Sequence, residues 1–352
     1  MRLLSAALCT TIGAALLASC SGGNMSSPSS AIPGTSGGAS KVSSLHHHAA
    51  MAFIPRADLP KGPVKLKGRQ APASAIKGSY ASEFYGGFVN GYTKNNSGNN
   101  PSICTESVSS VNNFGVDGQG SLIIPAAFSG VNVYSPGMCG SLAATITDSY
   151  GQASDASSVN AMTGPIVVGN ILGPGFVVNC TVSSLTCTQL TPGSAGIGEV
   201  AGVGMNAAGD CWADSFNAAF TAVELTWWAG CTGTGTVTTG FLNTGYGGVD
   251  VDNKGNIVTF NWHGSAGTDL WVYSGCNPAC TSVSDNSLTN NSALFGHIGR
   301  QGERLIVGAY LAGQADIYAY TPTTLTYYYS FNNGLTASGL VEAAAYSPSS
   351  KK

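Results

Sequence analysis

The sequence predicts an all-β fold made of six small antiparallel sheets. Three observations lead to this prediction: few charged residues, many glycines and an internal repeat. Only 9% of the 352 residues are charged and 48 are glycines, while 43% are hydrophobic. The low charge argues against a charge-patterned helical bundle or coiled coil. The composition is instead typical of short strands, tight turns and a large apolar core.

The repeat unit is an apolar strand, a polar turn that contains a glycine, and a second apolar strand. One copy reads Gly248-Val-Asp-Val-Asp-Asn-Lys-Gly-Asn-Ile-Val258. We expect a positive φ at each turn glycine, because a tight hairpin turn requires it and other residues adopt it at a cost. These glycines recur at separations of 44, 45, 46 and 47 residues: Gly120, Gly164, Gly209, Gly255 and Gly302.

Third and fourth strands follow in most units. Asp269–Tyr273 and Asp316–Tyr320 alternate branched or aromatic residues with polar ones, as half-buried third strands do. Leu142–Ile146 and Thr324–Ser330 are expected as fourth strands. Four strands in about 45 residues, repeated along the chain, predict the blades of a β-propeller.

The chain ends complete the ring. Five units begin near residues 111, 156, 200, 247 and 295, and residues 80–108 before them offer a second, a third and a fourth strand without a first. Val341–Tyr346 is expected to supply the missing innermost strand. Residues 78–350 are therefore predicted to form a six-bladed β-propeller whose N- and C-terminal strands share one blade.

These motifs resemble the secreted NHL-like propellers of bacteria. That group is similar in fold to the six-bladed family that includes gluconolactonases and streptogramin lyases. The resemblance covers about three quarters of the chain and rests on short motifs such as Gly248–Ile257. It implies the fold, and it implies an activity only weakly, because one fold supports many functions.

The N-terminus has the pattern of a bacterial lipoprotein signal peptide. Leu3–Leu17 form an apolar run that is too short to span a membrane, and Leu17-Ala18-Ser19-Cys20 resembles a lipobox. Residues 1–19 are then the signal peptide, and Cys20 is lipidated with acyl chains such as palmitate that anchor the protein in the membrane. Ser21 resembles the pattern of lipoproteins sent to an outer membrane. The alternative is ordinary secretion with a free Cys20.

Residues 20–77 are expected to be a flexible tether rich in Ser, Gly and Pro. His46, His47 and His48 could bind a transition metal, but a solvated polar run is the preferred interpretation. Residues 21–77 carry seven basic residues and one acidic residue, whereas residues 78–350 carry four basic and 16 acidic residues. An acidic body argues against a nucleic-acid partner. The basic segment of residues 56–77 could lie on anionic lipid or against the acidic body.

Eight cysteines remain beyond Cys20 and the signal peptide. An even number in an oxidising compartment predicts disulfides, and the spacing offers no CxxC zinc motif. Two pairs could close hairpins within one blade, and a third could join neighbouring strands of one ladder. The fourth follows by elimination and would have to join adjacent blades, at a distance that the bond may not allow. The pairs are Cys180 with Cys187, Cys276 with Cys280, Cys211 with Cys231, and Cys104 with Cys139.

Candidate ligand-binding residues come from the loops that usually form the binding face of a propeller. Aromatic rings and carboxylates there could bind a sugar or a peptide, although they could also cover the ends of the sheets. The loops between second and third strands contain Phe128, Asp214, Phe216, Trp262, His263 and Tyr310. Those before first strands contain Asp148, Asp155 and Glu199.

Two functions remain open at this point. The preferred hypothesis is a membrane-anchored extracytoplasmic module that binds protein or carbohydrate. The alternative is a metal-dependent lactonase or lyase with its site on the ring axis, where Ca²⁺ would need oxygen ligands from several blades. No catalytic residue and no metal ligand can be assigned, because Asp250 and similar residues sit where hairpin turns favour Asp or Asn. No cofactor is required by any motif.

Overall fold

The computed structural model describes most of the chain from residue 78 onward. The described residues are 78–93, 102–108, 111–126, 130–150, 152–171, 175–263, 267–288, 293–299, 304–309, 312–336 and 340–347. Cys20, the tether and the run His46–His48 lie outside them. Within these ranges, no helix has the length and apolarity that a membrane span requires.

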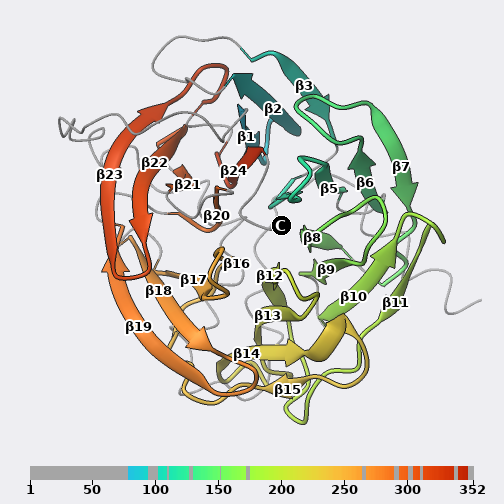
Figure 1. The fold of residues 1–352 in the computed structure, drawn as a ribbon, viewed down its shortest axis with the longest axis vertical. Helices are drawn as coiled ribbons and strands as arrows, with labels where there is room; N and C mark the ends of the chain where they lie inside the picture. The colour runs from blue at the N-terminus through green and yellow to red at the C-terminus, as the bar shows by residue number, and fades with distance from the viewer. Residues whose placement is uncertain are drawn as a thin grey trace, which may run out of the picture. The chain divides into compact units, whose positions relative to one another are not determined.

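The described residues form six four-stranded antiparallel sheets, arranged as blades around one axis (Figure 1). The prediction of a six-bladed β-propeller is confirmed. The first three blades, each written from the inner to the outer strand, are as follows. Blade 1 is β24 (Ala344–Ser347), β1 (Gly78–Glu83), β2 (Phe88–Thr93) and β3 (Cys104–Ser107); blade 2 is β4 (Gly115–Val116), β5 (Leu122–Ala126), β6 (Gly130–Tyr134) and β7 (Leu142–Ile146); blade 3 is β8 (Ala153–Ser158), β9 (Ile166–Asn170), β10 (Phe176–Thr181) and β11 (Thr186–Gln189).

The other three blades follow in the same order from the axis outward. In blade 4, a short 3₁₀ helix, Ala229–Cys231, leads to an outer strand of only two residues. Blade 4 is β12 (Val200–Met205), β13 (Cys211–Phe216), β14 (Val223–Trp228) and β15 (Thr236–Val237); blade 5 is β16 (Val249–Val251), β17 (Ile257–Trp262), β18 (Thr268–Gly275) and β19 (Cys280–Ser287); blade 6 is β20 (Gly296–Ile298), β21 (Arg304–Ala309), β22 (Gln314–Thr321) and β23 (Thr324–Phe331).

The two ends of the described chain close the ring. β24 pairs with β1, and Gly78 lies opposite Ser347 in that ladder. Figure 1 shows β24, in red, beside β1, in blue. Pairing of the C-terminal segment with the N-terminal blade gives β1 a ladder on both sides and leaves it no free edge.

The turn glycines meet the expectation in part. Gly120, Gly209 and Gly255 have φ values of 90°, 89° and 82°, which is the left-handed region that favours glycine. Gly164 does not belong to the residues with positive φ, because its turn is longer: its N–H donates to the carbonyl of Asn160 four residues back. Gly302 lies outside the described residues.

Buried aspartates join inner strands of neighbouring blades. Asp155 in β8 accepts the N–H of Val203 in β12 at 2.7 Å, and Asp250 in β16 accepts the N–H of Ile298 in β20, also at 2.7 Å. Both pairs are 48 residues apart, so they occupy equivalent places in successive repeats. The inner strands therefore run in the same direction around the axis, and the equivalent ends of all blades lie on the same face of the ring.

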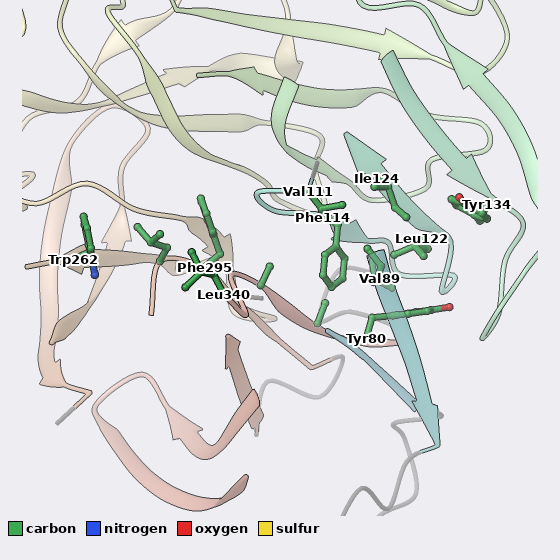
Figure 2. Packing of buried hydrophobic residues seen from close by; sticks show 14 residues of the cluster. Tyr80, Val89, Val111, Phe114, Leu122, Ile124, Tyr134, Trp262, Phe295 and Leu340 are labelled. Carbon is green, nitrogen blue, oxygen red and sulfur yellow. The ribbon is translucent and has the colours of Figure 1, made fainter. Parts of the chain in front are cut away.

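Apolar side chains fill the space between blades. Figure 2 shows one cluster in which Tyr80 and Val89 of blade 1 lie near Phe114 and Leu122 of blade 2. Tyr80 and Phe114 meet edge to face, with ring centroids 6.4 Å apart. Removing such surface from water contributes about 25 cal/mol per Å² to folding, so contacts between blades, as well as those within them, stabilise the ring.

All eight cysteines from Cys104 onward form disulfides, which confirms that the chain is disulfide-bonded. The bonds are Cys104–Cys139, Cys180–Cys187, Cys211–Cys231 and Cys276–Cys280. The first joins blade 1 to the β6–β7 connection of blade 2, with a Cα–Cα distance of 5.9 Å. That distance lies within the usual range for a disulfide. The other three each lie within a single blade.

The Cys104–Cys139 disulfide should stabilise the ring more than the Cys276–Cys280 disulfide. The first bond spans 35 residues and the second spans four, and a longer closed loop restricts the unfolded chain more. We expect the double variant Cys104→Ser/Cys139→Ser to lose about 4 kcal/mol of unfolding free energy, and Cys276→Ser/Cys280→Ser about 2 kcal/mol. Urea unfolding without reductant measures both. Equal losses would contradict the entropic explanation.

Candidate functional site

The predicted ligand-binding residues do not form an exposed aromatic surface among the described residues. Phe128 and Tyr310 lie outside those residues. Asp214 and Phe216 lie within β13 and not in a loop, and both are buried. Trp262 is the last residue of β17 and is also buried. The expectation that these three side chains occupy loops is therefore wrong.

The reason is that the second strands continue further than their sequence suggests. Phe216 still pairs with Val223, and Trp262 pairs with Thr268. Trp262 also forms an isolated bridge with Tyr246, which lies just before β16. Ladder pairing on both sides of these positions covers the aromatic rings with neighbouring backbone and side chains.

Tyr246 is the centre of a buried cluster at this end of the ring. Its ring stacks on that of Phe216, with centroids 5.3 Å apart, and Phe216 stacks in turn on Phe220 at 6.1 Å. The Tyr246 hydroxyl lies 3.4 Å from the carbonyl oxygen of Val200, to which it donates. The stacked rings of Phe220, Phe216 and Tyr246 therefore join blade 4 to the start of blade 5.

Three carboxyl groups lie near the Tyr246 hydroxyl. Burial raises the pKa of this phenol well above its ordinary value, and the charges of Glu199, Asp214 and Glu342 raise it further. Asp214 and Glu342 are fully buried, whereas Glu199 is partly exposed. The polypeptide brings these groups together from blade 4 and from the segment before β24. Sequence reasoning singled out Glu199 and Asp214 but missed Tyr246 and Glu342.

Asp214 is the most unusual member of this cluster. Neither of its carboxyl oxygens has a hydrogen-bond partner among the described residues. Burial raises its pKa well above the ordinary value, because the ionised form cannot be solvated there. The group therefore keeps its proton to a higher pH than an exposed aspartate does.

A second cluster of buried polar side chains links inner strands near the axis of the ring. The amide of Asn113, before β4, donates to Oδ1 of Asp155 at 2.7 Å. Its own oxygen lies 3.2 Å from Nε2 of His297 in β20, so the imidazole donates here. His297 Nδ1 lies 3.9 Å from Oδ2 of Asp250. Asp250, His297, Asn113 and Asp155 lie in or beside the inner strands of blades 5, 6, 2 and 3, in that order. Their contacts therefore connect blade 6 to blade 2 without a side chain from blade 1.

Of the candidates named above that the structure describes, His263 is the most exposed. It follows β17, and its Nε2 lies 3.0 Å from Oδ2 of Asp269 and 3.2 Å from Nδ2 of Asn261. About a third of each side chain of the His263–Asp269 pair is accessible. These contacts hold the imidazole of His263 at the edge of blade 5.

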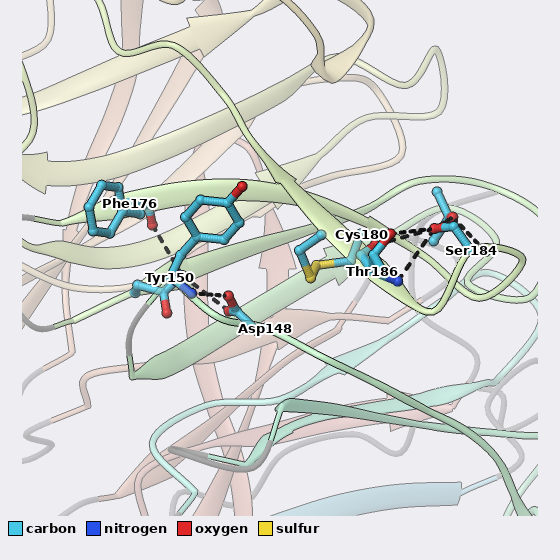
Figure 3. Close-up of a disulfide and its surroundings, with 9 residues drawn as sticks. Asp148, Tyr150, Phe176, Cys180, Ser184 and Thr186 are labelled. Carbon is cyan, nitrogen blue, oxygen red and sulfur yellow. Dashed lines mark hydrogen bonds between the residues drawn. A yellow bond between two sulfur atoms is a disulfide. The ribbon is translucent and has the colours of Figure 1, made fainter.

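The residues before inner strands have different environments. Asp148 accepts the N–H of Tyr150 at 3.0 Å (Figure 3), and burial raises the pKa of its carboxyl. Tyr150 packs near Phe176, and the Cys180–Cys187 disulfide lies further along the same blade. Asp155, expected in a loop, is the third residue of β8 and is fully buried. Its hydrogen bonds give it a structural role between blades.

The described part of the chain holds no group of three or more His, Cys, Asp or Glu side chains placed to bind one metal ion. This statement covers the carboxyl groups around Tyr246 and the residues around His297.

A comparison with solved structures supports the fold. The chain is similar to a protein of unknown function from Bacteroides caccae, with a TM-score of 0.53 and 8% identity, over 78% of this chain and 99% of that one. The ring is a β-propeller. The chain is also similar to U3-55K, with a TM-score of 0.47 and 11% identity over 65% of this chain and 70% of that one. The WD40 domain of Toxoplasma gondii coronin gives a TM-score of 0.47 and 10% identity over 74% and 77%.

No protein-family model and no curated protein matches the chain. At 8% identity, the similarity to the Bacteroides caccae protein supports the fold of this chain and not a ligand.

Proposed function

We propose that this protein is an extracytoplasmic lipoprotein whose propeller binds a protein or a carbohydrate. The observation that carries the proposal is the cysteine usage. All eight cysteines of the propeller are paired in disulfides, which form in oxidising compartments outside the cytoplasm. Cys20 has no place among these pairs and lies at the end of an apolar run, where a lipidated cysteine is expected.

The composition of the body supports a binding role. The acid-rich propeller and the exposed His263–Asp269 pair offer polar groups to a ligand. The tether of residues 20–77 would hold that ring away from the lipid. The similarity of the repeats to secreted NHL-like propellers favours the same extracytoplasmic location. Ser21 after Cys20 resembles the pattern of lipoproteins sent to an outer membrane, where the cell has one.

The anchoring test is the substitution Cys20→Ala. We expect the unmodified protein to sediment with membranes and to incorporate labelled palmitate. The variant should lose both properties while keeping its four disulfides, because the propeller does not depend on Cys20. A variant that remains in the membrane fraction would refute lipid anchoring.

The binding test is a screen of the purified full chain against envelope glycans and secreted peptides. Saturable binding at micromolar concentrations or below would support the proposal. Sustained turnover of a lactone in the presence of an added divalent metal would instead support an enzyme.

A further inference from the structure

The facing surfaces of blades 4 and 5, which we call the 4–5 seam, contain several buried polar atoms without a partner. Four side chains of the seam carry such an atom, unpaired among the described residues: Asp214, Trp227, Thr238 and Trp271. A buried polar atom of this kind costs free energy, because it has lost its hydrogen bonds to water and formed none in exchange. Water that enters the seam would satisfy these atoms, so they favour its opening.

Strand alternation shows that Asp214 faces this seam. Successive residues of a strand point to opposite faces, so Asp214 lies on the same face of β13 as Trp212 and Phe216. Trp212 Nε1 donates to the carbonyl oxygen of Cys276 in blade 5 at 2.8 Å. Phe216 stacks on Tyr246, which precedes β16. The carboxyl group of Asp214 therefore lies between two contacts that cross from blade 4 to blade 5.

The other three side chains lie further out along the same seam. Trp227 in β14 and Trp271 in β18 belong to one apolar cluster between the two blades. Thr238 follows β15 and donates its N–H to the carbonyl of Leu225, which is the ladder partner of Asp214. Residues paired in a ladder point to the same face, so the Thr238 hydroxyl also faces blade 5. The unpartnered atoms therefore extend from β13 to the rim of the ring.

Asp214 has no counter-charge in the seam. Burial raises the pKa of this carboxyl well above its ordinary value, and no charge of the described residues opposes the shift. The described titratable groups that share its surroundings are carboxyls and phenols, which cannot become positive: Glu199 before β12, Tyr246 before β16, Tyr273 in β18, Asp285 in β19 and Glu342 before β24. An ionised Asp214 is therefore stable only where water reaches it.

Few contacts close the rim of the seam. The outer strand β15 has only two residues. Beyond it, the N–H of Thr239 donates to the carbonyl of Pro278 at 3.0 Å, and the N–H of Cys280 donates to the carbonyl of Thr239 at 2.8 Å. Segment 239–248 then leads inward to β16. Opening of the seam would break these two hydrogen bonds and the stacking of Phe216 on Tyr246, which gives water access to Asp214.

We propose that the 4–5 seam is a pH-sensitive joint, which is closed while Asp214 keeps its proton and opens locally when Asp214 releases that proton to water. In the open joint Asp214 ionises near pH 4, as an exposed aspartate does, whereas in the closed joint it stays protonated to higher pH. Each opening above about pH 4 therefore releases one proton. The opening constant then rises about tenfold per pH unit until the pKa of the closed state is reached.

The joint goes beyond the proposed binding function and does not rest on it. An extracytoplasmic propeller with such a joint would respond to the pH of its surroundings. Neither a ligand nor the lipidation of Cys20 enters the measurement described below, so failure of the binding screen or of the Cys20→Ala test would leave its result unchanged.

The test is amide hydrogen exchange of the full chain in nonionic detergent. Rates are corrected for the pH dependence of exchange in an unfolded chain. We expect the opening constant of residues 239–248 and 276–280 to rise about tenfold between about pH 5 and pH 6. This rise should persist with little change in low concentrations of urea, because a local opening exposes little surface. No rise, or a strong dependence on urea as in global unfolding, would overturn the proposal.

Two matched variants assign the proton to one residue. Asp214→Asn cannot release it and should abolish the tenfold rise in the seam. The control, Asp316→Asn, removes another buried carboxyl with a raised pKa, but from β22 of blade 6, so it should keep the rise. Should Asp214→Asn fail to fold, Asp214→Leu replaces it, and the comparison within the unmodified protein needs neither. An unchanged rise without Asp214, or its loss in Asp316→Asn, would refute the joint.

Discussion

Replacement of Asp155 by alanine is expected to lower the unfolding free energy by about 3 to 5 kcal/mol. The carboxylate accepts three hydrogen bonds of 2.7 Å, from the N–H groups of Ala156 and Val203 and from the amide of Asn113. It is fully buried. Alanine would leave three buried donors without an acceptor, and a buried unsatisfied donor costs more than the hydrogen bond itself contributes.

Two further variants make the Asp155 prediction specific. Asp155→Asn retains one acceptor oxygen and should lose less stability than alanine. Asp210→Ala removes a partly exposed carboxylate that accepts the N–H of Gly230 at 2.7 Å, and it should cost about 1 kcal/mol. Urea unfolding followed by circular dichroism gives all three values. A loss at Asp155 no larger than that at Asp210 would show that the inner-strand link does not stabilise the ring.

Asp316 should make the stability of the propeller fall as the pH rises from about 4 to about 7. Burial raises the pKa of this carboxyl to about 7, and the hydrogen bond from the Gln314 amide opposes the shift only in part. Below pH 4 both folded and unfolded chains are protonated at this group, so its contribution is complete. Between pH 4 and 7 only the unfolded chain releases the proton, which costs the folded state about 4 kcal/mol in total.

The substitution Asp316→Asn removes this titratable group, so the unfolding free energy should vary less with pH. We expect the variant to match the unmodified protein near pH 4 and to exceed it in unfolding free energy by about 4 kcal/mol near pH 7. Gln314→Ala removes the hydrogen bond that favours the charged form, so the loss of stability should still begin near pH 4 but extend to higher pH and become larger. Unfolding by urea at several pH values measures these differences. Parallel curves for the two proteins would show that Asp316 is not protonated in the folded state.

The fold could be predicted because its determinants are local and repeated. Glycine-containing turns at nearly equal spacing mark the hairpins, and alternation in Asp269–Tyr273 marks a half-buried strand, which is observed as part of β18. Leu142–Ile146 is β7 as expected. The expected strand at Val341–Tyr346 is shifted and begins only at Ala344, because its start is set by pairing with β1.

The candidate site was predicted less well. Loop assignment placed Asp214, Phe216 and Trp262 on the rim, yet strand pairing continues to Phe216 and Trp262 and buries all three. Tyr246 and Glu342 were missed because neither belongs to a recognisable motif. A polar or aromatic residue shortly before an inner strand was the available signal, and Asp148, Asp155 and Glu199 were the residues chosen on it.

The sequence by itself determined the number of blades and the closure of the ring by both chain ends, because each depends on residues close together in the chain or on a regular period. Only the tertiary structure decided which side chains meet at the axis. Asn113, Asp155 and His297 come from three blades and up to 184 residues apart, and no local pattern encodes such a contact.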